Sequence, residues 1–165
     1  MALPAVKAAA VPLLQGLAWF VALYTLYGLS PAAAAWFIED ATVRPAVWLL
    51  GLVAPDWQPQ AAGARLWVTG GALHVLPGCE GADLALLSAS AMLAAPLAWR
   101  WRLLGLTAML TAVFVLNQLR LLLLLLAHLR EPAWFDPLHT LWLPLAMVML
   151  LGSLLLAWTA RFDKP

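Results

Sequence analysis

The segment Leu103–Ala127 constrains this chain more than any other feature. It is nearly all apolar and longer than the roughly 20 residues that a helix needs to cross a bilayer, yet Arg120 lies inside it. An arginine at the centre of a membrane helix costs about 2.5–3.5 kcal/mol on insertion scales. We therefore expect the Arg120 guanidinium to have a partner or a task inside the fold.

Composition assigns the chain to a class. Hydrophobic residues make up 65% of its 165 residues and charged residues 10%, whereas soluble domains average about 45–50% apolar and about 25% charged. This composition indicates an integral membrane protein, and the length predicts a single domain over residues 1–165. The net charge of only +1 gives no indication of a nucleic-acid partner.

The expected fold is an all-α membrane protein, a polytopic bundle of about four transmembrane helices. Each predicted helix is apolar and about long enough to cross the hydrocarbon core. The four predicted spans are Ala8–Leu29, Ala82–Trp99, Leu103–Ala127 and Pro137–Ala160.

A fifth apolar stretch, Pro31–Pro55, is interrupted by charge. Glu39, Asp40 and Arg44 lie within it, and Pro45 is at its middle. We interpret it as a helix lying on or dipping into the membrane surface. A full crossing is the alternative, and it would reverse the side on which everything after it lies.

Basic residues predict the orientation. With four crossings, one set of span ends carries the basic residues, and the positive-inside rule places those ends in the cytoplasm together with both termini. Cys79 and His139 then lie on the extracytoplasmic side. The basic residues at these ends are Lys7, Arg100, Arg102, Arg161 and Lys164.

A short extracytoplasmic β-hairpin is expected over residues 64–77. Arg65–Thr69 and Ala72–Leu76 have β-forming composition, and Gly70-Gly71 between them suits a two-residue turn. The hairpin leads into Cys79 at the top of the second span.

Cys79 is the only cysteine, so it forms no internal disulfide. It is either a small packed hydrophobe or a nucleophile. A helix N-terminus favours the thiolate, and Gly78 and Gly81 leave room for another backbone to approach. The adjacent Glu80 carboxylate opposes thiolate formation unless its charge is neutralised.

Asn117 and Arg120 share one face of the third span because they are three residues apart. At 1.5 Å per residue, Arg120 is about 25 Å from Leu103, near the depth of Cys79. It can stabilise an oxyanion and a thiolate there. The structural alternative is a pair between Arg120 and Asp83, with Asn117 in a helix–helix hydrogen bond.

His139 is the expected general base. Asp136-Pro137 is a favourable helix start, which places His139 in the first turn, where the helix dipole opposes protonation. His128 and His74 are competing bases and rank below it in that order. The three histidines are too widely spread for a metal site, and no cofactor is expected.

Together these motifs resemble the exosortase/archaeosortase family of membrane-embedded cysteine transpeptidases. The resemblance rests on Cys79-Glu80-Gly81, on Asn117-Gln118-Leu119-Arg120 and on His139 before the last span, and it covers roughly residues 44–158. The charged Glu80 departs from the small or polar neutral residue of many members. The chain is also shorter than the members with eight spans.

The resemblance implies roles and a substrate class. Cys79 would be the nucleophile, Arg120 the transition-state stabiliser and His139 the proton-transfer residue, with Asn117, Asp83, Glu80 and Gly81 as supporting or substrate-binding residues. The partners would be exported proteins with a C-terminal sorting signal: a short motif, an apolar helix and a basic cluster. The location implied is the bacterial inner membrane, where an acyl-thioester forms on the extracytoplasmic side and a glycan or lipid is a possible acceptor.

Two alternatives from other functional classes stay open at this point. One is a non-enzymatic membrane scaffold in which Arg120 and Asp83 form a structural pair. The other is a binding site for an anionic lipid or glycan carrier, with Arg120 as the phosphate contact.

Overall fold

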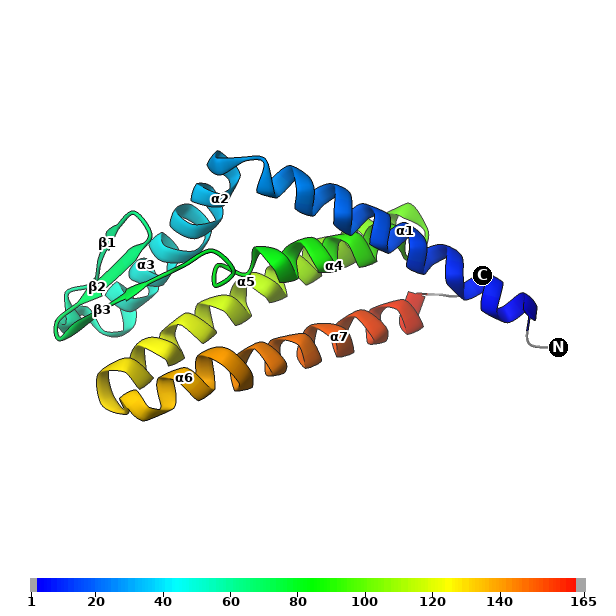
Figure 1. Ribbon diagram of the computed structural model, residues 1–165. Helices are drawn as coiled ribbons and strands as arrows, with labels where there is room; N and C mark the ends of the chain where they lie inside the picture. Colours follow the sequence, from blue (N-terminus) through cyan, green and yellow to red (C-terminus); the bar gives the residue numbers. More distant parts are fainter. Residues whose placement is uncertain (1–2, 163–165) are drawn as a thin grey trace.

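The protein is mostly helical, with a small antiparallel sheet at one end (Figure 1). The computed structural model describes the backbone of residues 3–162 and the side chains from residue 11 onward. The α-helices are α1 (Leu3–Gly28), α2 (Pro31–Ile38), α3 (Arg44–Val53), α4 (Ala82–Ala94), α5 (Trp99–Arg130), α6 (Phe135–Pro137) and α7 (Leu143–Phe162). The strands are β1 (Gln60–Ala62), β2 (Arg65–Val68) and β3 (Gly71–His74), and the short π- and 3-10-helical turns are η1 (Glu39–Val43), η2 (Pro55–Trp57), η3 (Pro132–Trp134) and η4 (Leu138–Trp142).

Within the described residues, three helical segments are long and apolar enough to cross a membrane. They are Val11–Gly28 within α1, Trp99–Arg130, which is α5, and Pro132–Phe162, which includes α7. These lengths fit a multi-pass membrane protein and agree with the first, third and fourth predicted spans.

The second predicted span, Ala82–Trp99, is wrong in length. Helix α4 has 13 residues and ends at Ala94, so it is about 20 Å long and shorter than a hydrocarbon core of about 30 Å. The chain turns because Pro96 disfavours helical backbone at Ala95, which is extended at ψ 137°. Arg102 stabilises this turn by donating Nε to the Leu97 carbonyl (2.8 Å) and Nη1 to the Leu93 carbonyl (3.0 Å).

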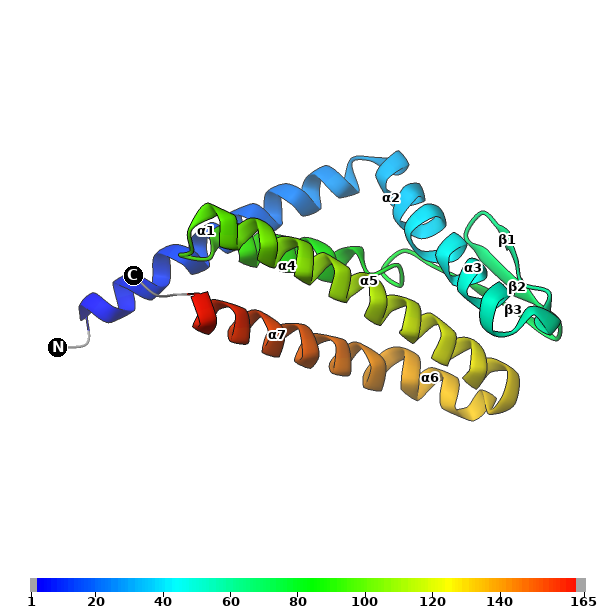
Figure 2. The same ribbon diagram turned by 180° about the vertical axis from the view of Figure 1, so that it is seen from behind.

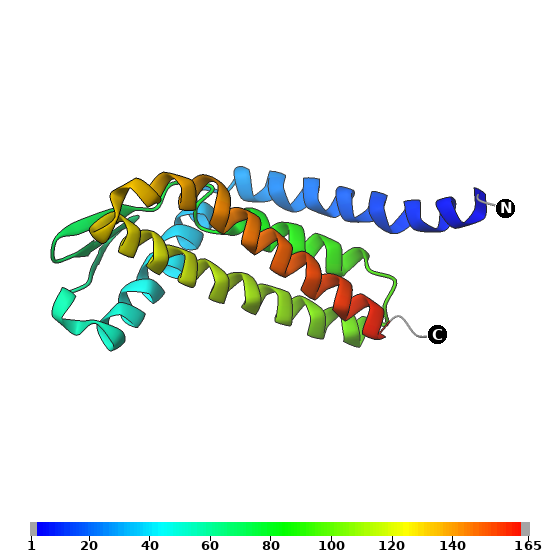
Figure 3. The same cartoon turned by 90° about the horizontal axis from the view of Figure 1, so that it is seen from below.

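The long helices place the charged turn and the sheet at opposite ends. The turn between α4 and α5, the first turn of α1 and the last turn of α7 lie toward one end, whereas the sheet lies at the other (Figures 1 and 2). Seen from below, the far end of α5 and η4 lie beside the sheet (Figure 3). Arg100, Arg102 and Arg161 therefore share one end, as the charge pattern predicts, whereas Lys164 lies outside the described residues.

The predicted hairpin over residues 64–77 is confirmed, and the sheet has one strand more. Strands β2 and β3 pair antiparallel from Arg65 opposite His74 to Val68 opposite Gly71. Strand β1 adds to the other edge of β2 in the order β1-β2-β3. The sequence Gln60–Ala62 has none of the β-branched or aromatic residues that are typical of strands, so β1 was not predicted.

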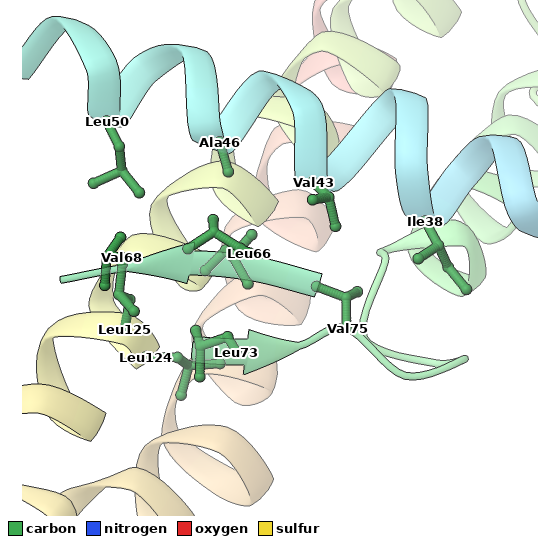
Figure 4. Close-up of a cluster of buried hydrophobic side chains, with 11 residues drawn as sticks. Ile38, Val43, Ala46, Leu50, Leu66, Val68, Leu73, Val75, Leu124 and Leu125 are labelled. Carbon is green, nitrogen blue, oxygen red and sulfur yellow. The ribbon is translucent and has the colours of Figure 1, made fainter. Parts of the chain in front are cut away.

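The sheet, α3 and the outer part of α5 share a hydrophobic core (Figure 4). Strand alternation buries Leu66 and Val68 of β2, and Leu73 of β3, between the two helices. Helix α5, with 32 residues, is therefore longer than a membrane crossing requires, and its C-terminal part packs against the sheet. The remaining core side chains are Ile38, Val43, Ala46, Leu50, Val75, Leu121, Leu124 and Leu125.

The predicted surface helix Pro31–Pro55 is a continuous helical run through α2, η1 and α3. One π-helical turn interrupts it, with the Arg44 amide bonded to the Glu39 carbonyl. Pro45 has no N–H to donate to the carbonyl of Ala41, four residues earlier in the helix. That carbonyl accepts a hydrogen bond from Gln118 Nε2 of α5 (3.2 Å). This contact joins the run to α5; its position relative to a bilayer stays a prediction.

At the other end, α4, α5 and α7 meet at Gly105 of α5. A Cβ added there would lie 2.3 Å from Cε of Met92 and 2.6 Å from Nε1 of Trp158. The Trp158 ring is fixed because its Nε1 donates to the Trp101 carbonyl at 3.1 Å. The absence of a side chain at residue 105 therefore permits the close approach of three helices.

We predict that Gly105→Leu destabilises the helix packing by about 1–3 kcal/mol, since the indole cannot move without breaking its hydrogen bond. Tryptophan-fluorescence melting of the protein in detergent measures the change in Tm. Gly152→Leu in α7 is the matched control, because a Cβ at Gly152 meets nothing within 4 Å. Equal Tm values for the two variants would contradict this packing.

Candidate functional site

Four of the predicted site residues, together with the competing base His74, line one small cavity. It measures about 40 Å³, more than the ~10–15 Å³ that one water needs, and it lies where β3, the loop before α4, α5 and η4 meet. The predicted residues in its wall are Cys79, Asn117, Arg120 and His139. The rest of the lining consists of Leu73, His74, Val75, Leu121, Leu124 and Phe135.

The thiol and imidazole are in direct contact. Cys79 Sγ lies 3.1 Å from His139 Nε2, although the two residues are 60 positions apart. The Cys79 amide donates to the Leu76 carbonyl (2.9 Å) in a tight turn, and Gly78 has φ +90°, a value that favours glycine. Thiol and imidazole at this distance can transfer a proton.

Arg120 reaches the same point from α5. Its side chain is 9% exposed, and Nη1 is 3.5 Å from the Cys79 carbonyl oxygen. Among the described residues, Nε of Arg120 has no hydrogen-bond partner. A guanidinium with unused donors, shielded from water beside a thiol, can stabilise negative charge on a bound carbonyl oxygen.

Asn117 fixes the backbone that follows the cysteine. Its Nδ2 donates to the Glu80 carbonyl at 2.9 Å, and Thr42 Oγ1 of η1 lies between this oxygen (3.2 Å) and the Phe37 carbonyl (2.9 Å), to either of which it can donate. Asn117 therefore holds the loop that carries the thiol. Gly81 follows with φ +81°, and a Cβ there would lie 3.1 Å from Asn117 Cγ.

The His139 ring is held by an aromatic neighbour. Phe135 stacks on it with ring centroids 5.6 Å apart and an interplanar angle of 20°, and it meets His128 edge-on at 5.8 Å. His139 lies in the π-helical turn η4, which follows a helix that begins at Phe135. The expectation that Asp136 caps this helix is wrong, because the capping position is Trp134 and no side chain caps it.

The competing histidines His74 and His128 make no hydrogen bond with Cys79 Sγ. His74 is exposed on β3 and contributes to the cavity wall, whereas His128 is exposed and is not in the lining. Of the three, His139 is the one whose nitrogen contacts Cys79. The described residues include no group of three or more His, Cys, Asp or Glu side chains placed to hold a metal ion.

The Glu80 side chain lies apart from the thiol. It is 4% exposed, accepts a hydrogen bond from the Tyr27 hydroxyl of α1 at 2.6 Å, and is not part of the Cys79 cavity wall. The Tyr27 hydroxyl therefore satisfies one oxygen of this buried carboxylate and leaves its charge in place. This contact ties α1 to the site loop.

Asp83, like Glu80 and Gly81, is a predicted site residue that is not in the cavity wall. It is exposed and absent from the cavity wall, and within the described side chains no ion pair joins it to Arg120. The reason is helical geometry: Ala82 and Ala85 turn toward the protein interior, and Asp83 is rotated about 100° from Ala82.

Sequence reasoning missed Thr42, Tyr27 and Phe135. Thr42 is 1% exposed, and a threonine among apolar residues beside Glu39 and Asp40 was a weak signal. Phe135, four residues before His139, had the spacing of helix neighbours. Tyr27 gave no local signal, since its partner is 53 positions away.

Comparisons with models of protein families, with curated proteins and with solved structures found no match. Inference about function therefore rests on the geometry of this cavity and on the sequence motifs.

We predict that His139→Ala slows alkylation of Cys79 by iodoacetamide at neutral pH about tenfold, because the thiolate reacts and the imidazole accepts its proton. Cys79 is the only cysteine, so the rate reports one group. His128→Ala is the control and should leave the rate unchanged. Equal rates for the wild type and His139→Ala would show that the contact has no effect on the thiol.

Gly81→Ala should destabilise the fold by about 1–2 kcal/mol, because a left-handed backbone is strained for alanine and its methyl group would press on Asn117. Gly28→Ala at the end of α1 is the matched control, with nothing within 4 Å of the added Cβ. The Tm of each variant in detergent measures the effect. A Tm for Gly81→Ala as high as that of Gly28→Ala would contradict the described loop conformation.

Proposed function

We propose that the protein is a membrane-embedded cysteine peptidase or transpeptidase that cleaves the C-terminal sorting signals of exported proteins. The observation that carries this proposal is the 3.1 Å contact between Cys79 Sγ and His139 Nε2, with the Arg120 guanidinium in the same cavity. The resemblance of the three motifs to the exosortase/archaeosortase family supports it.

The first step is acylation of the thiol. His139 Nε2 takes the proton from Sγ, and the thiolate attacks the carbonyl carbon of the scissile amide. The tetrahedral intermediate then collapses: the C–N bond breaks, the amine leaves with the proton from His139, and an acyl-thioester stays on Cys79. His139, neutral again, takes the proton of water or of another nucleophile as that nucleophile attacks the thioester, and the C–S bond breaks to release the thiolate.

Arg120 stabilises the charge that develops on the carbonyl oxygen. Its Nη1 lies near the Cys79 backbone, and its Nε has no hydrogen-bond partner among the described residues. The positive charge of the guanidinium is therefore already in place before substrate binds. A preorganised donor of this kind is worth roughly 10²–10³ in rate. Its burial in apolar surroundings strengthens that interaction because water does not screen it.

The depth of the site suits a substrate that is itself partly in the membrane. Asn117 is about 27 Å along α5 from Trp99, which is close to the thickness of the hydrocarbon core. With the arginine-bearing ends in the cytoplasm, Cys79 faces the extracytoplasmic side of a bacterial inner membrane. A motif directly outside an apolar helix of an exported protein would reach the thiol at that level.

The test is cleavage of an exported reporter that ends in a randomised short motif, an apolar helix and a basic cluster, with an epitope tag after the cluster. Co-expression with the wild type should remove the tag from the reporters whose motif is recognised, as read by immunoblot of the membrane fraction. We predict that Cys79→Ala abolishes this processing and that Arg120→Ala lowers it about 10²-fold or more.

Asp83→Asn is the matched control, because Asp83 is exposed and outside the cavity wall, and it should process normally. Tm values and membrane abundance establish that each variant is folded. Processing by Cys79→Ala at the wild-type level would refute the proposal. Loss of abundance with Arg120→Ala, combined with no effect of Cys79→Ala, would indicate a scaffold.

A further inference from the structure

A second cavity lies beside the thiol site and shares Asn117 with it. It measures about 300 Å³ and is formed by α2, η1, the start of α4 and the middle of α5. Its polar wall consists of Glu80, Gly81 and Asn117, and the rest is apolar. The proposed reaction makes no use of the Glu80 carboxylate or of this space.

Two buried acceptor atoms at this cavity lack partners. Glu80 is 4% exposed and Asn117 3%, and within the described residues Glu80 Oε2 and Asn117 Oδ1 each have no hydrogen-bond donor. The other Glu80 oxygen accepts from Tyr27. No lysine, arginine or histidine nitrogen of the described side chains lies within 4.0 Å of the Glu80 carboxylate. A buried carboxylate without a cation is unfavourable. A positively charged hydrogen-bond donor bound at the polar end of this cavity would therefore stabilise it.

The remaining walls are apolar and open toward lipid. Leu110 and Phe114 are 39% and 42% exposed, and Trp36 of α2 is 54% exposed. Leu110 is two helical turns below Asn117, about 10 Å deeper along α5. Acceptor atoms at the outer level and an apolar wall beneath them match a molecule with a cationic head and a hydrocarbon chain.

We propose that this cavity binds a phospholipid with a primary ammonium head group, the ammonium on Glu80 and Asn117 and an acyl chain along Leu110 and Phe114. A primary ammonium donates N–H bonds to both oxygens, and Phe37 and Trp36 add aromatic walls suited to a cation. A trimethylammonium head has no N–H to donate. An anionic head group without an amine is repelled by Glu80. The inference does not depend on the proposed peptidase activity.

The first experiment uses the wild-type protein alone. The delipidated protein in neutral detergent is mixed with phosphatidylethanolamine, its mono- and dimethyl derivatives, phosphatidylcholine and phosphatidylglycerol of identical chains, and bound lipid is counted by native mass spectrometry. We expect retention to fall with each methyl group and to be about fivefold or more higher for the primary amine than for phosphatidylcholine. Equal retention across the methylation series, or a preference for phosphatidylglycerol, would overturn the proposal.

The second experiment removes the carboxylate. Glu80→Gln should reduce the preference for the primary amine to about that of phosphatidylcholine, whereas Asp83→Asn, an exposed acid three residues later, should keep it. Cys79→Ala should also keep it, so that lipid binding and peptidase activity can fail separately. An unchanged preference in Glu80→Gln excludes the site, and if that variant does not fold, the methylation series on the wild type decides alone.

Discussion

The structure depends on hydrogen bonds from one polar patch of α5 to irregular backbone. Asn117 donates to the Glu80 carbonyl, Gln118 to the Ala41 carbonyl and Arg120 to the Cys79 carbonyl. Near the hydrocarbon region, carbonyls outside regular helical bonding need protein partners because water is scarce there. Arg120 thus both contacts the backbone of the thiol loop and gives the cavity its positive charge, so a change at this residue affects the loop and the cavity together.

Two prolines shape the backbone around this patch in the same way. Pro45 is the second residue of α3 and follows the π-helical turn η1, and Pro144 is the second residue of α7 and follows η4. A proline lacks the N–H of a regular turn, and π-helical turns inside α-helices are frequent at functional sites. One of these turns places Thr42 beside the Glu80 carbonyl and the other places His139 beside the thiol, so both distortions contact the segment Cys79-Glu80.

The residues that meet across three segments were largely predictable, because each stood out against apolar surroundings. An arginine and an asparagine three apart in a membrane helix must face the interior, and the topology carries Cys79 and His139 to the same depth. The supporting contacts were not predictable, since Tyr27, Thr42 and Phe135 are unremarkable in their own segments. Composition also overestimated α4: residues Ala82–Trp99 are apolar enough for a span, but Pro96 and the reach of Arg102 end the helix early.

Helix α5 supplies both a membrane-length segment and part of the core beneath the sheet, and this has a consequence for biosynthesis. Strands β2 and β3 leave the ribosome before α5, yet Leu66 and Leu73 pack against Leu124 and Leu125. The hairpin can therefore form its turn early but cannot complete its core until the C-terminal part of α5 has been synthesised. Completion of this core is therefore tied to the order in which the chain emerges, and the thiol cavity is completed later still, because Phe135 and His139 follow α5 in the sequence.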